Sequence, residues 1–185
     1  MDLVCEPKHK ITLVGSAYFI GFAMGFGLFS LPDNYGRKKF LNFTMPVYLV
    51  ASLVVVHHQS LVAKGIGFFV QGLLHVKIPV CYTYMFEMAP QSSRVVSTTL
   101  ISAFDECCFG VFGVALLFWT HDAVKVLQLV NVIESAAVLL FLLVAPESPT
   151  WLFNNEDYLK CSHSLRYVAF ANGKQLDRDI TYQLL

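Results

Sequence analysis

Apolar and polar residues alternate along this chain in long blocks rather than with a short period. Five predominantly apolar stretches are separated by brief polar connections, at residues 11–31, 40–56, 61–86, 95–120 and 123–145. A helix needs about 20 apolar residues to cross a bilayer core, with a lower limit of about 17. We therefore predict five transmembrane helices packed as one all-α bundle over residues 11–149.

Polar segments flank this predicted bundle. Residues 1–10 form a short polar start and residues 150–185 a polar tail. In the tail, 154–157 resembles a helix start, with amides followed by acids, and Asn172-Gly173 resembles a stop. Apolar residues recur between them at three- and four-residue spacing, at Tyr158, Cys161, Leu165 and Val168. This pattern predicts a short amphipathic helix over about 155–171, lying on the membrane or on a partner.

The connection between the first two stretches, Leu31–Lys39, carries the densest positive charge in the sequence. If it is cytoplasmic or on the matrix side, alternate connections share its side. That side then holds eight basic residues, namely Arg37, Lys38, Lys39, Arg94, Lys160, Arg166, Lys174 and Arg178, and the other side holds four, namely Lys8, Lys10, Lys64 and Lys125. The positive-inside rule predicts an outer N-terminus and an inner C-terminus. It does not choose between the plasma membrane and an organelle inner membrane.

Composition supports the membrane class. The 185 residues are 56% hydrophobic and 14% charged, with a mean hydropathy of +0.57. A soluble domain has about 25% charged residues. Thirteen basic and thirteen acidic residues cancel, which argues against a nucleic-acid-binding protein.

Small residues on two of the stretches predict close helix contacts. Gly21 and Gly25, like Ala23 and Gly27, have the spacing that lets helix backbones approach closely in membranes. Gly110-x-x-Gly113 is a further candidate.

Polar side chains within the stretches are costly to bury, and such residues usually face a partner or a cavity. The third stretch carries Gln71, His75 and Lys77, the fourth Asp105 and Glu106, and the fifth Asn131 and Glu134. Lys77 falls at a depth similar to that of Asp105 and Glu106, which predicts an ion pair. This set indicates either a substrate- or proton-coupled cavity or a charge pair that fixes helix register.

The sequence contains no metal-ligand spacing, nucleophile elbow or phosphate-binding loop. We therefore expect neither an enzyme nor a cofactor.

Four motifs in order resemble the N-terminal half of major facilitator superfamily transporters, in particular organic cation and anion transporters and sugar porters. They cover about residues 2–174 and comprise Asp33-Asn34-Tyr35-Gly36-Arg37-Lys38, Val70-Gln71-Gly72, Glu87 with Arg94, and Pro146-Glu147-Ser148-Pro149-Thr150-Trp151-Leu152. The resemblance implies that the five helices correspond to helices 2–6 of that half. It also implies that the charged motif residues belong to a gating network.

The chain departs from these motifs at six positions. Phe29, Pro32 and Asn34 replace a glycine, an alanine and an arginine of the loop motif. In the fourth helix and the final motif, Phe68, His75 and Thr150 replace an arginine, a glycine and an arginine. Relative to the family, the chain is expected to lack the first helix, the large outer loop and helices 7–12.

These departures lead to two hypotheses. The first is a transporter-derived structural or accessory subunit of a larger membrane complex, not competent for transport alone, in which lipid and other membrane subunits cover the open face. The second is the N-terminal half, or a fragment, of an organic-ion or sugar transporter. The substrate, if there is one, stays open.

Overall fold

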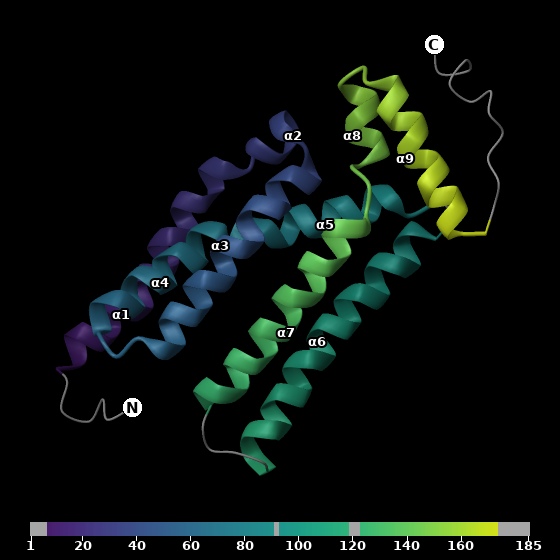
Figure 1. The fold of residues 1–185 in the computed structure, drawn as a ribbon. Helices are drawn as coiled ribbons and strands as arrows, with labels where there is room; N and C mark the ends of the chain where they lie inside the picture. The colour runs from purple at the N-terminus through teal and green to yellow at the C-terminus, as the bar shows by residue number, and fades with distance from the viewer. Residues whose placement is uncertain (1–6, 91–92, 119–122, 174–185) are drawn as a thin grey trace.

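The computed structural model describes residues 7–90, 93–118 and 123–173, and every regular element among them is helical. The first stretch forms α1 (Lys8–Gly25), a 3₁₀ turn η2 (Phe26–Leu28) and a short helix α2 (Leu31–Tyr35). The second forms α3 (Arg37–His57). Figure 1 shows α1, α3 and α4 side by side with α2 at their upper end, and α6 and α7 as a long pair beside them.

The third stretch is one helix with a break in its middle. It consists of α4 (Leu61–Leu73), the 3₁₀ turn η3 (Leu74–Val76) and α5 (Lys77–Met88). Pro79 lies four residues after His75, and a proline ring inside a helix clashes with the carbonyl four residues before it. This clash, together with the missing proline N–H, gives a local reason for the 3₁₀ turn that contains His75.

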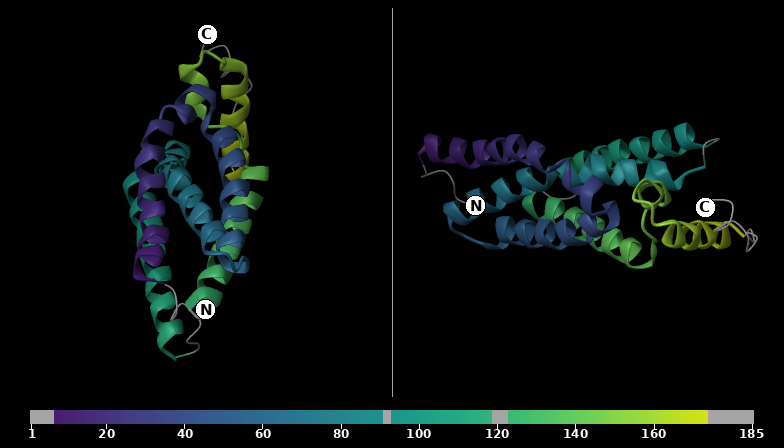
Figure 2. Two further views of the ribbon diagram at one scale, coloured as in Figure 1. Left: turned by 90° about the vertical axis from the view of Figure 1, so that its left-hand side faces the viewer. Right: turned by 90° about the horizontal axis from the view of Figure 1, so that it is seen from above.

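The later stretches form α6 (Arg94–Phe118) and α7 (Ala123–Val144), followed by α8 (Pro149–Asn154) and α9 (Tyr158–Ala171). Figure 2 shows these last two helices gathered at one end of the elongated molecule. That end also holds α2, the start of α3 and the end of α5 (Figure 1).

Glycines let α1 and α4 pack backbone to backbone. A Cβ atom added to Gly21 would lie 2.9 Å from the backbone nitrogen of Leu73, and one added to Gly72 would lie 2.9 Å from that of Phe22. Gly25 lies equally close to the backbone of α4. The close approach predicted for Gly21 and Gly25 is therefore observed, and Gly72 supplies its counterpart.

The other small-residue pairs are not used in this way. Gly27 is exposed, and a Cβ added to it would have no heavy atom within 4 Å, while Ala23 is exposed as well. Gly110 and Gly113 also have no neighbour within that distance among the described atoms. Among the described residues these positions make no close helix contact, because the spacing alone does not tell which helix face meets a partner.

The core lies where α3, α5 and α7 meet. Its buried side chains come from all three helices and from η3, namely Phe40, Leu41, Met45, Val76, Val80, Tyr84, Leu142 and Ala145. This core adjoins the end of the bundle at which α2, α8 and α9 lie (Figure 1). The polar groups at this end of the bundle are therefore held by packed helix ends.

Two boundaries differ from the sequence-based expectation. The connection Leu31–Lys39 is mostly helical, because Pro32 fits the first turn of α2 and only Gly36 interrupts the chain. The amphipathic helix begins at Tyr158, with Asp157 as its cap, because the preceding residues Pro149–Asn154 form α8. Its end at Asn172 and Gly173 is as predicted.

Within the described part of the chain, two helical stretches are long and apolar enough to cross a membrane. These are Arg37–His57 and Leu61–Met88, and Thr12–Leu28 and Ser135–Val144 form shorter apolar helices. The count of five membrane-spanning helices stays a prediction.

Candidate functional site

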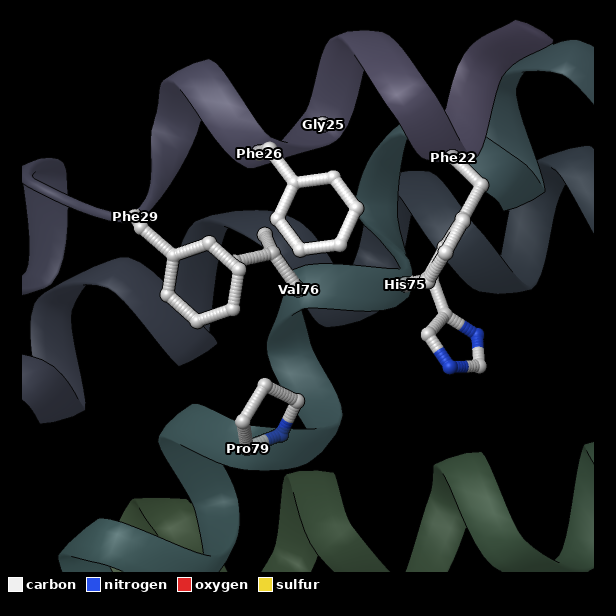
Figure 3. A pocket seen from close by; sticks show the side chains of 7 residues that line it. All are labelled: Phe22, Gly25, Phe26, Phe29, His75, Val76 and Pro79. Atoms are coloured by element: carbon white, nitrogen blue, oxygen red, sulfur yellow. The ribbon is translucent and has the colours of Figure 1, made fainter. Parts of the chain in front are cut away.

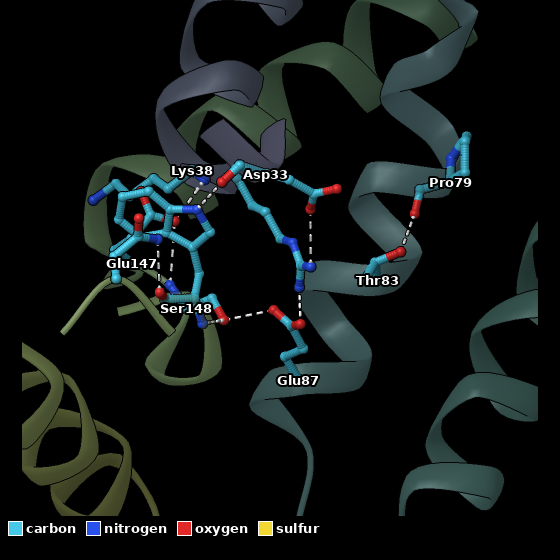
Figure 4. Close-up of polar contacts among 10 residues, drawn as sticks. Asp33, Lys38, Pro79, Thr83, Glu87, Glu147 and Ser148 are labelled. Atoms are coloured by element: carbon cyan, nitrogen blue, oxygen red, sulfur yellow. Dashed lines mark hydrogen bonds and ion pairs between the residues drawn. The ribbon is translucent and has the colours of Figure 1, made fainter. Parts of the chain in front are cut away.

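A cluster of charged and polar groups joins several helix ends at one end of the bundle. We call it the helix-end cluster, and it comprises Asp33, Arg37, Lys38, Glu87, Glu147 and Ser148 (Figure 4). These residues come from α2, the start of α3, the end of α5 and the segment between α7 and α8. Residues that are 50 to more than 100 positions apart in the sequence are thus brought together.

An arginine–glutamate ion pair lies at its centre. Arg37 Nη1 pairs with Glu87 Oε1, and Arg37 Nη2 lies 3.3 Å from Asp33 Oδ1. The side chains of Arg37 and Glu87 are only 14% and 11% exposed, whereas that of Asp33 is 69% exposed. The pair with Glu87 is therefore the shielded one, in which loss of Arg37 leaves Glu87 without a cation and loss of Glu87 leaves Arg37 with only the exposed Asp33.

Ser148 connects this pair to α8. Its hydroxyl donates to Glu87 Oε2 at 2.5 Å and accepts from the backbone N–H of Trp151 at 3.2 Å. The second contact makes Ser148 the N-cap of α8, with Pro149 in the first helical turn. A single buried hydroxyl thus links the end of α5 to the start of α8.

Glu147 performs a similar role toward α3. Its Oε1 accepts from the backbone N–H of Lys38 at 2.8 Å and from that of Ser148 at 3.2 Å. The Lys38 ammonium donates to the carbonyl of Ala145 at 2.5 Å, near the end of α7. Lys38 therefore acts through both its backbone and its side chain.

Gly36 makes room for this carboxylate. Its φ of 102° and ψ of 141° lie in a region that residues with a Cβ rarely adopt, and a Cβ there would lie 2.8 Å from Glu147 Oε2. Gly36, the retained glycine of the loop motif, is thus required both by its backbone conformation and by the lack of space for a side chain.

Three further residues complete the cluster and were not among the predicted site residues. The Tyr84 hydroxyl donates to the carbonyl of Pro146, Trp151 Nε1 donates to the carbonyl of Asp33 at 2.7 Å, and Ser164 Oγ donates to the carbonyl of Glu147 at 2.7 Å. Trp151 belongs to the motif Pro146–Leu152, and Tyr84 lies three residues before Glu87 of the Glu87/Arg94 motif. In both motifs only other residues were selected as site residues. Ser164 carries no sequence signal.

Two predicted motif residues lie apart from the cluster. Arg94 Nε donates to the carbonyl of Ala89 at 3.2 Å, and its guanidinium lies 4.8 Å from the ring centroid of Phe86. Gln71 Nε2 donates to Ser52 Oγ at 2.9 Å and so connects α4 to α3. These contacts stabilise neighbouring helix segments.

The intramembrane polar residues are placed in part. Lys77 is 4% exposed, and its ammonium lies 3.3 Å from the ring centroid of Tyr48 on α3, which is a cation–π contact. The side chains of Asp105, Glu106, Asn131 and Glu134 lie outside the described residues, so the ion pair predicted for Lys77 stays a prediction.

His75 lines a small aromatic pocket between α1 and the η3 turn (Figure 3). Its Nδ1 is hydrogen-bonded to the Tyr18 hydroxyl at 2.8 Å. The cavity has a volume of about 190 Å³ and is lined by Phe22, Gly25, Phe26, Phe29, His75, Val76 and Pro79. Phe29, which replaces the loop-motif glycine, is one of the lining residues and is 41% exposed.

Among the described residues, no group of histidines, cysteines and carboxylates could hold a metal ion. The helix-end cluster offers no activated nucleophile either. The charged groups of the cluster contact one another or backbone groups of neighbouring helix ends. They therefore hold these helix ends in one arrangement by buried ion pairing and charge-assisted hydrogen bonds.

Comparison with known proteins gives the family. Residues 5–181 match the family model of sugar (and other) transporters. The human organic cation/carnitine transporter 2 is 27% identical over 178 residues, covering 93% of this chain and 31% of the relative. The mouse organic anion transporter 3 is 27% identical, covering 94% and 32%. The arabinose-proton symporter of Bacillus subtilis is 24% identical, covering 96% and 40%.

The chain spans about a third of the length of the first of these relatives. The relatives are membrane transporters rather than enzymes, and the apolar helices of this chain agree with an integral membrane location. With nearly all of its residues matched by the family model, the chain belongs to the sugar (and other) transporter family of the major facilitator superfamily.

Proposed function

We propose that this chain forms part of one half of a solute transporter, and that the helix-end cluster makes that half move as one rigid body. The contacts of Glu87 with Arg37 and Ser148 carry this proposal, since they tie α5 to both α3 and α8. Separation of α5 from α3 would break the shielded ion pair, and separation of α5 from α8 would remove the Ser148 hydrogen bond to Glu87. Transporters of this kind work by rocking one repeat against another around a shared site.

A small organic ion or a sugar is the proposed solute. Relatives named for organic cations and anions align with 93% and 94% of this chain, and the arabinose-proton symporter aligns with 96%. These alignments support an organic ion or a sugar as the solute, and they do not distinguish between the two.

The accessory-subunit hypothesis receives less support. It rested on the helices expected to be missing together with the substituted motif residues, yet the retained charged residues contact one another and the backbone of neighbouring helix ends. Neither the relatives nor the described contacts favour a subunit role. The additional membrane subunits and the outer position of the N-terminus stay predictions. The choice between the plasma membrane and an organelle inner membrane stays open.

Purification in a mild detergent followed by mass spectrometry, together with solute-dependent melting, separates the two hypotheses. The solutes are tetraethylammonium, carnitine, benzoate and arabinose. We expect one of them to raise the melting temperature of the chain, alone or with the remainder of its transporter.

The double variant R37Q/E87Q is the matched variant for the rigid-body role. It removes both charges of the central pair, so solute-dependent stabilisation should weaken while the apolar core is unchanged. Stable stoichiometric binding to unrelated membrane proteins, with no response to any solute, would contradict the proposal.

A further inference from the structure

Helix α9 uses small and polar side chains for its inner face. Cys161, Ser162, Ser164 and Ala169 are buried. Besides the Ser164 contact with Glu147, the Cys161 thiol donates to the carbonyl of Pro149 at 3.4 Å. Small side chains therefore form the most buried part of this contact, and Tyr158 adds an edge-to-face contact with Phe153 of α8, 5.6 Å between ring centroids.

The outer face of α9 carries two such side chains. Leu159 is 74% exposed and Phe170 is 81% exposed. At about 100° per residue, eleven positions bring them back to nearly the same side of the helix. Leu159 and Phe170 thus lie at the two ends of one stripe, with His163 and Arg166 between them, and nothing among the described residues covers either apolar side chain.

Basic residues accompany this stripe. Lys160, His163 and Arg166 are exposed, and the segment Tyr158–Ala171 contains no acidic residue. Asp157, immediately before the helix, lies 2.5 Å from the Lys160 ammonium, whose side chain is still 75% exposed. The charge on the helix itself is positive, which is complementary to an anionic surface.

The direction of α9 fits such a surface. Figure 1 shows α9 turning away from the direction of α7, so that its axis crosses the long helices at their end. Where the long helices cross a bilayer, a helix that crosses them at their end runs along the bilayer surface.

We propose that the outer face of α9, formed by Leu159, His163, Arg166 and Phe170, lies on the anionic phospholipid surface at this end of the bundle. The two apolar side chains enter the interface, and the Arg166 guanidinium and the polar imidazole of His163 face the lipid phosphates. Because the bundle already holds α9 next to the membrane, the effective lipid concentration around α9 is high. A modest affinity for the lipid surface is therefore sufficient. The proposal concerns membrane docking and does not depend on transport.

Depth-dependent fluorescence quenching tests the contact in the whole chain. Native cysteines are replaced by alanine, and single cysteines at L159C, F170C or A171C receive an environment-sensitive fluorophore. The chain is placed in phosphatidylcholine vesicles with or without phosphatidylglycerol. Ala171 is the matched control, since it is exposed but points about 100° away from Phe170.

With phosphatidylglycerol present, we expect quenching by nitroxide lipids at 159 and 170 to be at least about twice that at 171. This difference should fall in phosphatidylcholine alone and in the variant K160Q/R166Q. Equal quenching of all three positions by aqueous iodide would overturn the proposal. So would protection of 159 and 170 from both quenchers, which indicates a protein contact such as a second copy. An unchanged melting temperature shows that each labelled chain remains folded.

Discussion

Replacing Gly36 by alanine tests whether the helix-end cluster depends on the backbone at the α2–α3 junction. The conformation of Gly36, with φ 102° and ψ 141°, lies near a region that is almost exclusive to glycine, and a side chain there costs about 1–3 kcal/mol. The added Cβ would also lie 2.8 Å from Glu147 Oε2. Moving that carboxylate weakens its hydrogen bonds to the backbone N–H groups of Lys38 and Ser148, which adds about 1 kcal/mol.

The expected loss is therefore about 2–4 kcal/mol, or roughly 5–12 °C in melting temperature for a chain of this size. Thermal unfolding in mild detergent, followed by tryptophan fluorescence, measures it, because Trp151 lies beside the cluster. G15A is the matched control, since Gly15 is helical with nothing within 4 Å of an added Cβ, and it should not lower the melting temperature because alanine is the better helix former.

The double variant G36A/E147A separates the two causes. If backbone strain dominates, the loss from G36A persists in the E147A background. A loss that disappears there would show that the carboxylate contact dominates. A melting temperature of G36A equal to that of the parent chain would refute the reasoning altogether.

Three other predictions concern the central pair, the contact of α1 with α4, and the tail. Arg37→Gln or Glu87→Gln alone should cost about 3–5 kcal/mol and both together much less, which a double-mutant cycle in the same melting assay measures. Gly72→Ala should prevent assembly of the bundle, seen as loss of the monodisperse peak in size-exclusion chromatography, while Gly27→Ala should not. Burial raises the pKa of the Cys161 thiol, so maleimide labelling near neutral pH, read by peptide mass spectrometry, should be slow in the folded chain and fast after denaturation.

The identity of the cluster residues was accessible from the sequence, but their contacts were not. Glu87 and Glu147 could be selected because they stand in motif segments. Their meeting with Arg37 and with the backbone of Lys38 depends on packing across 50 or more residues of sequence. Local spacing carries no information on such contacts, which follow from how α3, α5 and α7 share one core.

Other features had local signals that the hydrophobic pattern concealed. The stretch 61–86 has the hydrophobic pattern of one uninterrupted span, although Pro79 already indicated a break near His75. For the glycines of α1, two equivalent pairs were available. Only the position of Gly72 on α4 decides that Gly21 and Gly25, rather than Gly27, meet a partner.

The substituted motif positions take on a different meaning once they are placed. Asn34 and Thr150 are exposed, and Phe29, which lines the aromatic pocket, is exposed as well. None of them contributes a contact to the shielded pair of Arg37 and Glu87. The retained residues thus hold this bundle's own helix ends together, while Phe29, Asn34 and Thr150 face outward. Of the other substituted residues, Pro32 is buried at the start of α2, and His75 is hydrogen-bonded to Tyr18 of α1. Changes at outward positions alter what the bundle can pack against without weakening the bundle itself, so they are weak evidence that it has lost its ancestral role.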